Sequence, residues 1–199
     1  YYIDDLASAM RKETHVFFRH LLDNNLPTSE FLTAQYTFTN PALARLYHLP
    51  VEKSDFPNPD SFIRVSTEGH PRGGLLGHSS IHTVTANGVD TSPIIRGVWL
   101  LENILGTPPS PPPPDIEPIE PDTRGSTTIR DQMERHRSDP TCAECHRKID
   151  PLGFALENFD AIGRFRTNYG PRKNIVASGV LPGGQKFNDL GEFMWHFRN

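Results

Sequence analysis

A proline-rich segment divides the sequence. The stretch "TPPSPPPPDIEPIEP", residues 107–121, contains eight of the 19 prolines in the chain. Proline lacks a backbone N–H and clashes with a preceding helical turn, so this run excludes both a helix and a central strand. It favours extended polyproline II, a fairly stiff spacer. We therefore expect an N-terminal lobe over residues 1–106, a proline-rich strap over 107–121 and a second lobe over 122–199.

The N-terminal lobe is expected to combine helices with irregular segments. Apolar residues recur at helical spacing in residues 1–25. Asn-Pro and Ser-Pro pairs, which favour helix starts, open the expected helices at 40–49 and 92–106. Between them, residues 51–92 are rich in proline, glycine, serine and threonine. Short extended pieces are predicted there at "FIRVS" and "SIHTVTA", with a turn at Asn87-Gly88.

The second lobe is expected to add more helices and one hairpin. The sequence predicts a helix in "STTIRDQMERHR", a short helix around "GFALENFD" and a final helix from about residue 188. The segment "IVASGVLPGGQKF" predicts a hairpin that turns at its two adjacent glycines. The expected fold class is mainly α, with irregular proline- and glycine-rich segments and a small β-hairpin.

Charge and hydropathy exclude two classes of partner. The formal net charge is −4 and the chain contains no basic run, which argues against nucleic acid. No stretch approaches the roughly 18 consecutive apolar residues that a membrane span requires. The chain opens at Tyr1 directly on an amphipathic segment. We therefore expect it to be a piece of a longer or processed precursor.

Both cysteines of the chain lie in one short motif, "CAECH", as Cys142 and Cys145 followed at once by His146. Structural zinc needs four ligands, commonly from two such pairs, and the sequence has no second CxxC. A thioredoxin-like dithiol would follow a strand and open a helix, whereas this motif follows an expected helix and a proline. A disulfide across CxxC would close only a very short loop.

Covalent haem attachment explains every part of this motif. Each cysteine adds to one vinyl group of the porphyrin, and the adjacent histidine is directed at the iron. We predict one haem c, held by Cys142 and Cys145, with His146 as the proximal ligand. Apolar residues that could wall the flat ring follow, and two arginines could pair with its propionates. These residues are Pro151, Leu152, Phe154 and Phe159, then Arg164 and Arg166.

The segment from Arg96 to Arg166, which contains "DPTCAECHRKIDPLGFALENFDAIGRFR", resembles the haem-carrying module of large multidomain proteins abundant in planctomycetes. The segment "YTFTNPALARLYHLP" resembles the end of the module that precedes it in those proteins. The resemblance implies a cytochrome c-like haem lobe beside a helical N-terminal lobe. It also implies an extracytoplasmic location, in the periplasm or at the cell surface. It does not imply an activity.

The surroundings of the iron are only partly determined by the sequence. The second ring nitrogen of His146 should donate to a backbone carbonyl or a carboxylate. The nearest candidate is a carbonyl of an Asp150-Pro151 turn. An open, five-coordinate iron is one alternative for the distal side. The candidates for a distal ligand, in order of preference, are His136, Met194, His78 and His82.

Electron transfer is the favoured function. A single haem c would pass electrons between unidentified redox proteins or neighbouring domains of a longer chain. Two alternatives stay open: a peroxidase-like haem enzyme with an open distal site, and a non-redox haem sensor or structural module. The sequence contains no G-x-S-x-G, no Gly-rich phosphate loop and no H-E-x-x-H. No catalytic residue is therefore assigned.

Overall fold

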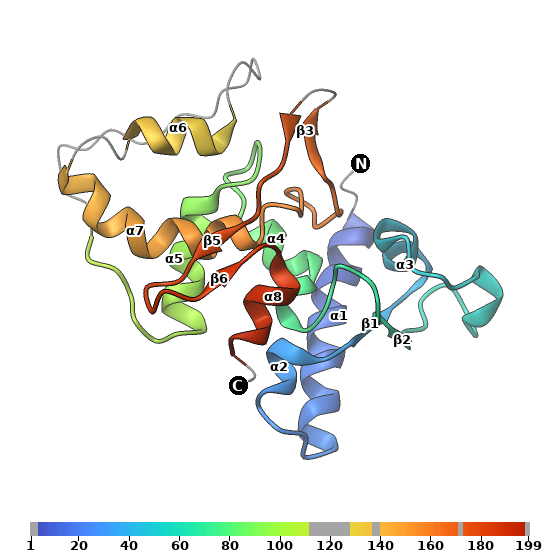
Figure 1. Ribbon diagram of the computed structural model, residues 1–199. Coiled ribbons are helices and arrows are strands. Elements are labelled where there is room, and N and C mark those ends of the chain that lie inside the picture. Colours follow the sequence, from blue (N-terminus) through green and yellow to red (C-terminus); the bar gives the residue numbers. More distant parts are fainter. Residues whose placement is uncertain (1–3, 112–127, 137–139, 171–172, 198–199) are drawn as a thin grey trace. The chain divides into compact units, whose positions relative to one another are not determined.

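The computed structural model describes residues 4–111, 128–136, 140–170 and 173–197 (Figure 1). Its regular structure is mostly helical, and the strands within these ranges form two-stranded antiparallel sheets. The expected fold class, mainly α with a small β-hairpin, is confirmed. None of the helices in these ranges is both long and apolar enough to cross a membrane.

The chain folds into two compact units that are interleaved in sequence. The first unit holds the residues up to Val84, Phe159–Phe165 and the residues from Leu190 onward. The second holds Thr85–Asn158 and Arg166–Asp189. This grouping differs from the expected division at the proline-rich strap, because residues on both sides of the strap contribute to the second unit. Residues 112–121 of the strap lie outside the described residues.

The first unit is built on the long N-terminal helix α1. Strands β1 and β2 pair antiparallel, with Tyr36 opposite Ser66 and Thr39 opposite Ile63. Its helices are α1 (Asp4–Asp23), α2 (Glu30–Thr33), α3 (Pro41–Tyr47), α4 (Ser79–Val84) and α8 (Leu190–Trp195), with 3₁₀ turns at Lys53–Asp55 and Leu75–Gly77, and its strands are β1 (Tyr36–Thr39) and β2 (Ile63–Ser66).

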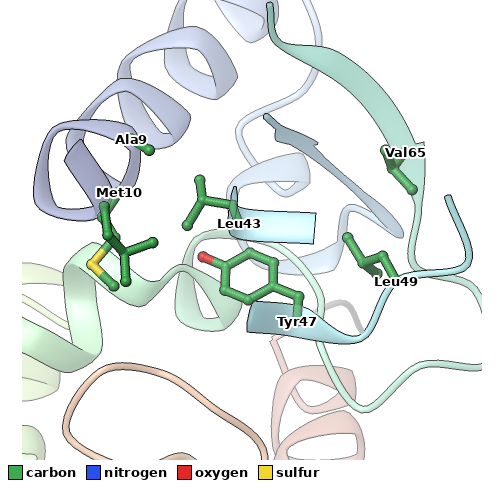
Figure 2. Close-up of a cluster of buried hydrophobic side chains, with 7 residues drawn as sticks. Ala9, Met10, Leu43, Tyr47, Leu49 and Val65 are labelled. Carbon is green, nitrogen blue, oxygen red and sulfur yellow. The ribbon is translucent and has the colours of Figure 1, made fainter. Parts of the chain in front are cut away.

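One hydrophobic cluster packs α1 against α3 and β2. Figure 2 shows Met10 of α1 beside Leu43 and Tyr47 of α3, with Val65 of β2 on the other side of the cluster. Leu43 is 0% exposed and Tyr47 is 1% exposed. Full burial of such a side chain stabilises the fold by roughly 1.5–3 kcal/mol. The cluster therefore fixes the start of the chain against the segment that follows it.

Local capping explains where α3 begins. The Asn40 side chain accepts a hydrogen bond from the Leu43 backbone N–H at 3.0 Å, and Pro41 occupies the first helical position. The helix ends at His48, which has a left-handed backbone with φ of 55°. The expected helix at residues 40–49 is thus confirmed, together with the chemistry that predicts its start.

The extended piece expected at "SIHTVTA" is wrong, because Ser79–Val84 form helix α4. The Thr83 hydroxyl donates to the Ser79 carbonyl at 2.9 Å, one helical turn earlier. Ile81 and His82 are buried. Packing in the first unit therefore overrides the strand preference of the β-branched residues. The nearby prediction of strand at "FIRVS" is correct, because it contains β2.

The second unit contains the cysteine motif. Strands β5 and β6 pair antiparallel with Gly179 opposite Phe187, which confirms the expected hairpin. Gly184 in its turn has φ of 87°, a conformation that favours glycine. The elements of this unit are α5 (Pro93–Asn103), α6 (Ile129–His136), α7 (Pro140–Ala155), β3 (Asn168–Gly170), β4 (Lys173–Asn174), β5 (Gly179–Val180) and β6 (Lys186–Phe187).

Helix α7 is longer than the sequence predicts. It continues through Pro151 to Ala155, so the expected turn at Asp150-Pro151 and the separate helix around "GFALENFD" are both wrong. Proline inside a helix removes one backbone hydrogen bond, that to the carbonyl of Arg147. Arg147 itself is an exposed residue of the helix. The motif and the residues that follow it therefore share one continuous helix.

Two glycines allow α5 and α7 to pack backbone to backbone. A Cβ atom added at Gly97 of α5 would overlap the carbonyl oxygen of Ile149. A Cβ atom added at Gly153 of α7 would overlap the carbonyl oxygen of Pro93. Such contacts tolerate no side chain at either position. They fix α7, and with it the cysteine motif, against α5.

We expect Gly153→Ala to lower the free energy of unfolding by about 3 kcal/mol, because the added methyl group meets backbone that cannot rotate away. Gly170→Ala is the matched control in the same unit, since nothing lies within 4 Å of its added Cβ. Urea unfolding followed by circular dichroism measures both. Equal stabilities for the two variants would show that the α5–α7 contact is looser than described.

Candidate functional site

The site is centred on the cysteine motif in helix α7. Cys145 and His146 follow Cys142 by three and four residues, so helical geometry puts both on the same face as Cys142. Cys142 and His146 are each 9% exposed, and Cys145 is half-buried. Both cysteines are free thiols. One face of one helix thus presents two thiols and an imidazole side by side.

The His146 ring is oriented by a carboxylate on its own helix. Its Nδ1 lies 2.8 Å from Oδ1 of Asp150, one turn later, and Asp150 is fully buried. A ring whose Nδ1–H donates to a carboxylate carries its lone pair on Nε2, the tautomer that a metal-binding imidazole needs. The partner is therefore the Asp150 side chain, and not the carbonyl of a turn.

Three of the expected apolar haem-wall residues lie on α7 itself. Leu152 and Phe154 are buried, at 1% and 2% exposed, and Pro151 is half-buried. The guanidinium carbon of Arg130, on α6, lies 3.7 Å from the centre of the Phe154 ring. Such a cation over an aromatic face is attractive. Three of the four expected haem-wall residues thus lie in the same unit as the cysteines.

Two hollows lie along α7. One has a volume of about 890 Å³ and is lined by Ala143, Asp150, Phe154 and Val180, among others. The other, of about 390 Å³, is lined by Cys145 together with Leu101 of α5 and the segment 107–110. Of the two thiols and the imidazole of the motif, Cys145 lines the smaller hollow and none lines the larger one. The helix that carries the motif therefore has space beside it.

The donor set fits covalent haem. Two free thiols and one oriented imidazole are the groups that a c-type haem uses. A structural zinc ion would need four ligands. Within the described ranges, no three His, Cys, Asp or Glu side chains form a group that could hold a metal ion.

Phe159 and Arg164 belong to the other unit from the cysteines. The Phe159 ring stacks on His82 with ring centres 4.5 Å apart and planes 20° from parallel. Arg72 lies over it at 5.0 Å. The Arg164 guanidinium pairs with Asp160 at 2.8 Å. Both expected haem contacts thus have partners inside the first unit.

Arg166 is held by carboxylates of the second unit. Its Nη2 lies 2.9 Å from Glu157 and 3.0 Å from the Thr91 hydroxyl. Glu157 is fully buried and also faces Arg96, at 3.5 Å. Burial raises the pKa of Glu157, and the two arginines oppose that rise. The expected propionate partner is therefore part of a buried ionic cluster that the motif analysis did not reveal.

His78 is enclosed by the first unit. Its Nδ1 lies 3.1 Å from the Thr14 hydroxyl and its Nε2 lies 3.5 Å from the Thr37 hydroxyl. Burial, reinforced by the charge of Arg72, lowers the pKa of His78 to about 3. The ring is therefore neutral at physiological pH, and its two nitrogens face hydroxyl groups of the same unit.

Of the other distal candidates, His82 and Met194 belong to the first unit, and His136 precedes the motif on α6. His82 is fully buried in the first unit against Phe159. Met194 lies on α8, where a Cβ added at Gly73 would meet its methyl group at 3.6 Å. His136 is the last residue of α6, and its side chain lies outside the described residues.

A buried carboxylate in the first unit escaped the sequence analysis. Glu13 is fully buried, and it accepts hydrogen bonds from Thr37 at 2.6 Å and Tyr47 at 2.5 Å. Burial raises the pKa of Glu13 from its ordinary 4.5 to about 7. The sequence could have indicated its burial, because Glu13 lies between Met10 and Phe17 on the apolar face of α1.

Two family models match the chain. Residues 72–169 match PSCyt3, described as a protein of unknown function (DUF1588). Residues 1–49 match PSD4, described as a protein of unknown function (DUF1592). The first match contains α5, α7 and the whole cysteine motif, and the second contains α1 and α3. No curated protein and no solved structure matches the chain.

We expect Glu13→Gln to change the pH dependence of stability. The folded chain holds the Glu13 proton up to about pH 7, whereas the unfolded chain releases it near pH 4.5. Protonated Glu13 therefore stabilises the fold at acid pH, and this stabilisation is lost as the pH rises from 4.5 to 7. The stability of the variant relative to the natural chain should therefore rise by roughly 3 kcal/mol over that range.

Comparing the two proteins at each pH removes the opposing effect of His78, whose depressed pKa weakens the fold as the pH falls below 6.5. Urea unfolding between pH 4.5 and 8 gives the difference. Glu68→Gln, at an exposed position of the same unit, controls for the loss of one carboxylate. A Glu13→Gln difference that stays constant with pH would contradict a protonated Glu13.

Proposed function

We propose that this chain is a mono-haem c-type cytochrome module that transfers single electrons. The observation that carries the proposal is the set of groups on α7: two free thiols with CxxC spacing, followed by an imidazole whose Nδ1 faces a buried carboxylate. Cys142 and Cys145 would form the thioethers, and His146 would be the proximal iron ligand. Haem supplies the one-electron chemistry when bound.

The described residues supply the supports that such a module needs. The α5–α7 glycine contacts hold the helix that would carry the haem. Leu152 and Phe154 exclude water from the side of that helix on which they are buried. Electron transfer requires a haem that is held, tuned and reachable, and it requires no general acid or base. This is why we favour it over peroxidase-like catalysis.

The proposal includes a place and a kind of partner. Only reduced thiols can form thioethers, and the haem of c-type cytochromes is attached after export. We therefore propose an extracytoplasmic location. The partner would be another redox protein, or a neighbouring domain if the chain is part of a longer protein.

Replacing the cysteines should remove covalent haem stepwise. When the chain is expressed with a haem-attachment system, we expect Cys142→Ala or Cys145→Ala to lose one thioether and shift the pyridine haemochrome band. The double variant should lose haem staining after denaturing electrophoresis. Glu144→Gln, between the two cysteines and exposed, should keep normal attachment. Haem that stays bound without either cysteine, or stoichiometric zinc in place of iron, would contradict the proposal.

Coordination should separate electron transfer from catalysis. We expect the reduced protein to be six-coordinate and low-spin, because a second axial ligand protects an electron-transfer haem from small molecules. Its optical spectrum should then stay unchanged under carbon monoxide. A high-spin spectrum that changes on addition of carbon monoxide would instead favour the peroxidase-like alternative.

A further inference from the structure

The partner of the His146 ring is a carboxylate, and this choice has an electronic consequence. Asp150 follows His146 by one helical turn, and its Oδ1 lies 2.8 Å from Nδ1. The Asp150 side chain is 1% exposed and that of His146 is 11% exposed. The contact is therefore short, internal to one helix and shielded from water.

A buried carboxylate affects an imidazole more strongly than a carbonyl does. A hydrogen bond to an ionised acceptor is roughly twice as strong as a neutral one, and a low local dielectric strengthens it further. Such a partner makes the imidazole a more basic ligand. A more basic axial ligand stabilises the oxidised iron relative to the reduced iron, and the reduction potential falls.

Other charged groups among the described residues lie near this pair. Arg147 and Arg130 line the same hollow as Asp150, and so do Glu134 and Glu144. Arg147 is exposed, so water screens its charge. Arg130 donates to the carbonyls of Val176 and Ser178, both at 2.8 Å, and lies over the Phe154 ring. The Asp150 carboxylate contacts the His146 ring directly, with Oδ1 2.8 Å from Nδ1.

We propose that Asp150 is a positioning residue that lowers the reduction potential of the haem through His146. The inference rests on the proposed function, because it needs iron bound at His146. It deepens that function by giving the module a direction: a haem of low potential donates electrons readily, so its partner would be an acceptor of higher potential.

The test is the midpoint potential of haem-loaded protein, measured by spectroelectrochemical titration. We expect Asp150→Asn to raise the potential by at least the equivalent of a tenfold change in the redox equilibrium constant, about 59 mV for one electron. Asp150→Glu, which keeps the carboxylate, should restore most of the low potential. Glu144→Gln removes an exposed charge of the same sign from the same helix, and should change the equilibrium constant less than threefold.

The ferric spectrum gives a second readout that a purely structural role would not move. Electron paramagnetic resonance g-values should shift in Asp150→Asn and stay unchanged in Glu144→Gln. A potential in Asp150→Asn equal to that of the natural chain, with haem attached to both, would overturn the inference. Absence of covalent haem from the natural chain would instead overturn the proposed function, so the two failures are distinguishable.

A measurement on the natural chain covers the case in which the Asp150 variants do not fold. In the reduced haem-loaded protein, proton NMR should show the His146 Nδ1 proton in slow exchange with water, as expected for a donor to a buried carboxylate. A proton that exchanges rapidly with water would overturn the inference without any substitution.

Discussion

The close packing of α5 on α7 is the contact on which the candidate site depends. Gly97 and Gly153 bring the two helix backbones together, each against a carbonyl oxygen of the other helix. Because α5 precedes the proline-rich segment and α7 follows it, neither part of the sequence forms the second unit alone. The cysteine motif thus takes its position from packing against a helix some forty residues earlier in the chain.

Both units bury charged groups, and in each the cost of burial is offset by specific partners. In the first unit, Arg72 donates to the carbonyls of Gly77 and Gly163 and lies over the ring of Tyr47, whose hydroxyl bonds to Glu13. In the second unit, Glu157 lies between Arg96 and Arg166. These clusters are highly directional, because each donor must meet one acceptor. They favour a single arrangement of each unit over looser alternatives that would leave a buried charge unpaired.

Features that depend on neighbouring residues could be predicted, and features that depend on distant contacts could not. Short stretches of sequence were enough to predict the helix start at Asn40-Pro41, the hairpin at Gly183-Gly184 and the CxxCH motif. The helix at Ser79–Val84 was missed because its sequence favours a strand, and only its buried environment makes it helical. The sequence correctly indicated that the partner of His146 lies at or near Asp150. Its side chain could not be chosen over a backbone carbonyl until the helix was known to continue through Pro151.

The interleaving of the two units has a consequence for the order in which the chain is made. The Gly163 carbonyl that binds Arg72, and the helix α8, belong to the first unit but are translated after Cys142 and Cys145. A chain that emerges from its amino terminus therefore exposes both thiols while the N-terminal unit still lacks its final segments. The N-terminal unit can therefore be completed only after the whole cysteine motif has been made.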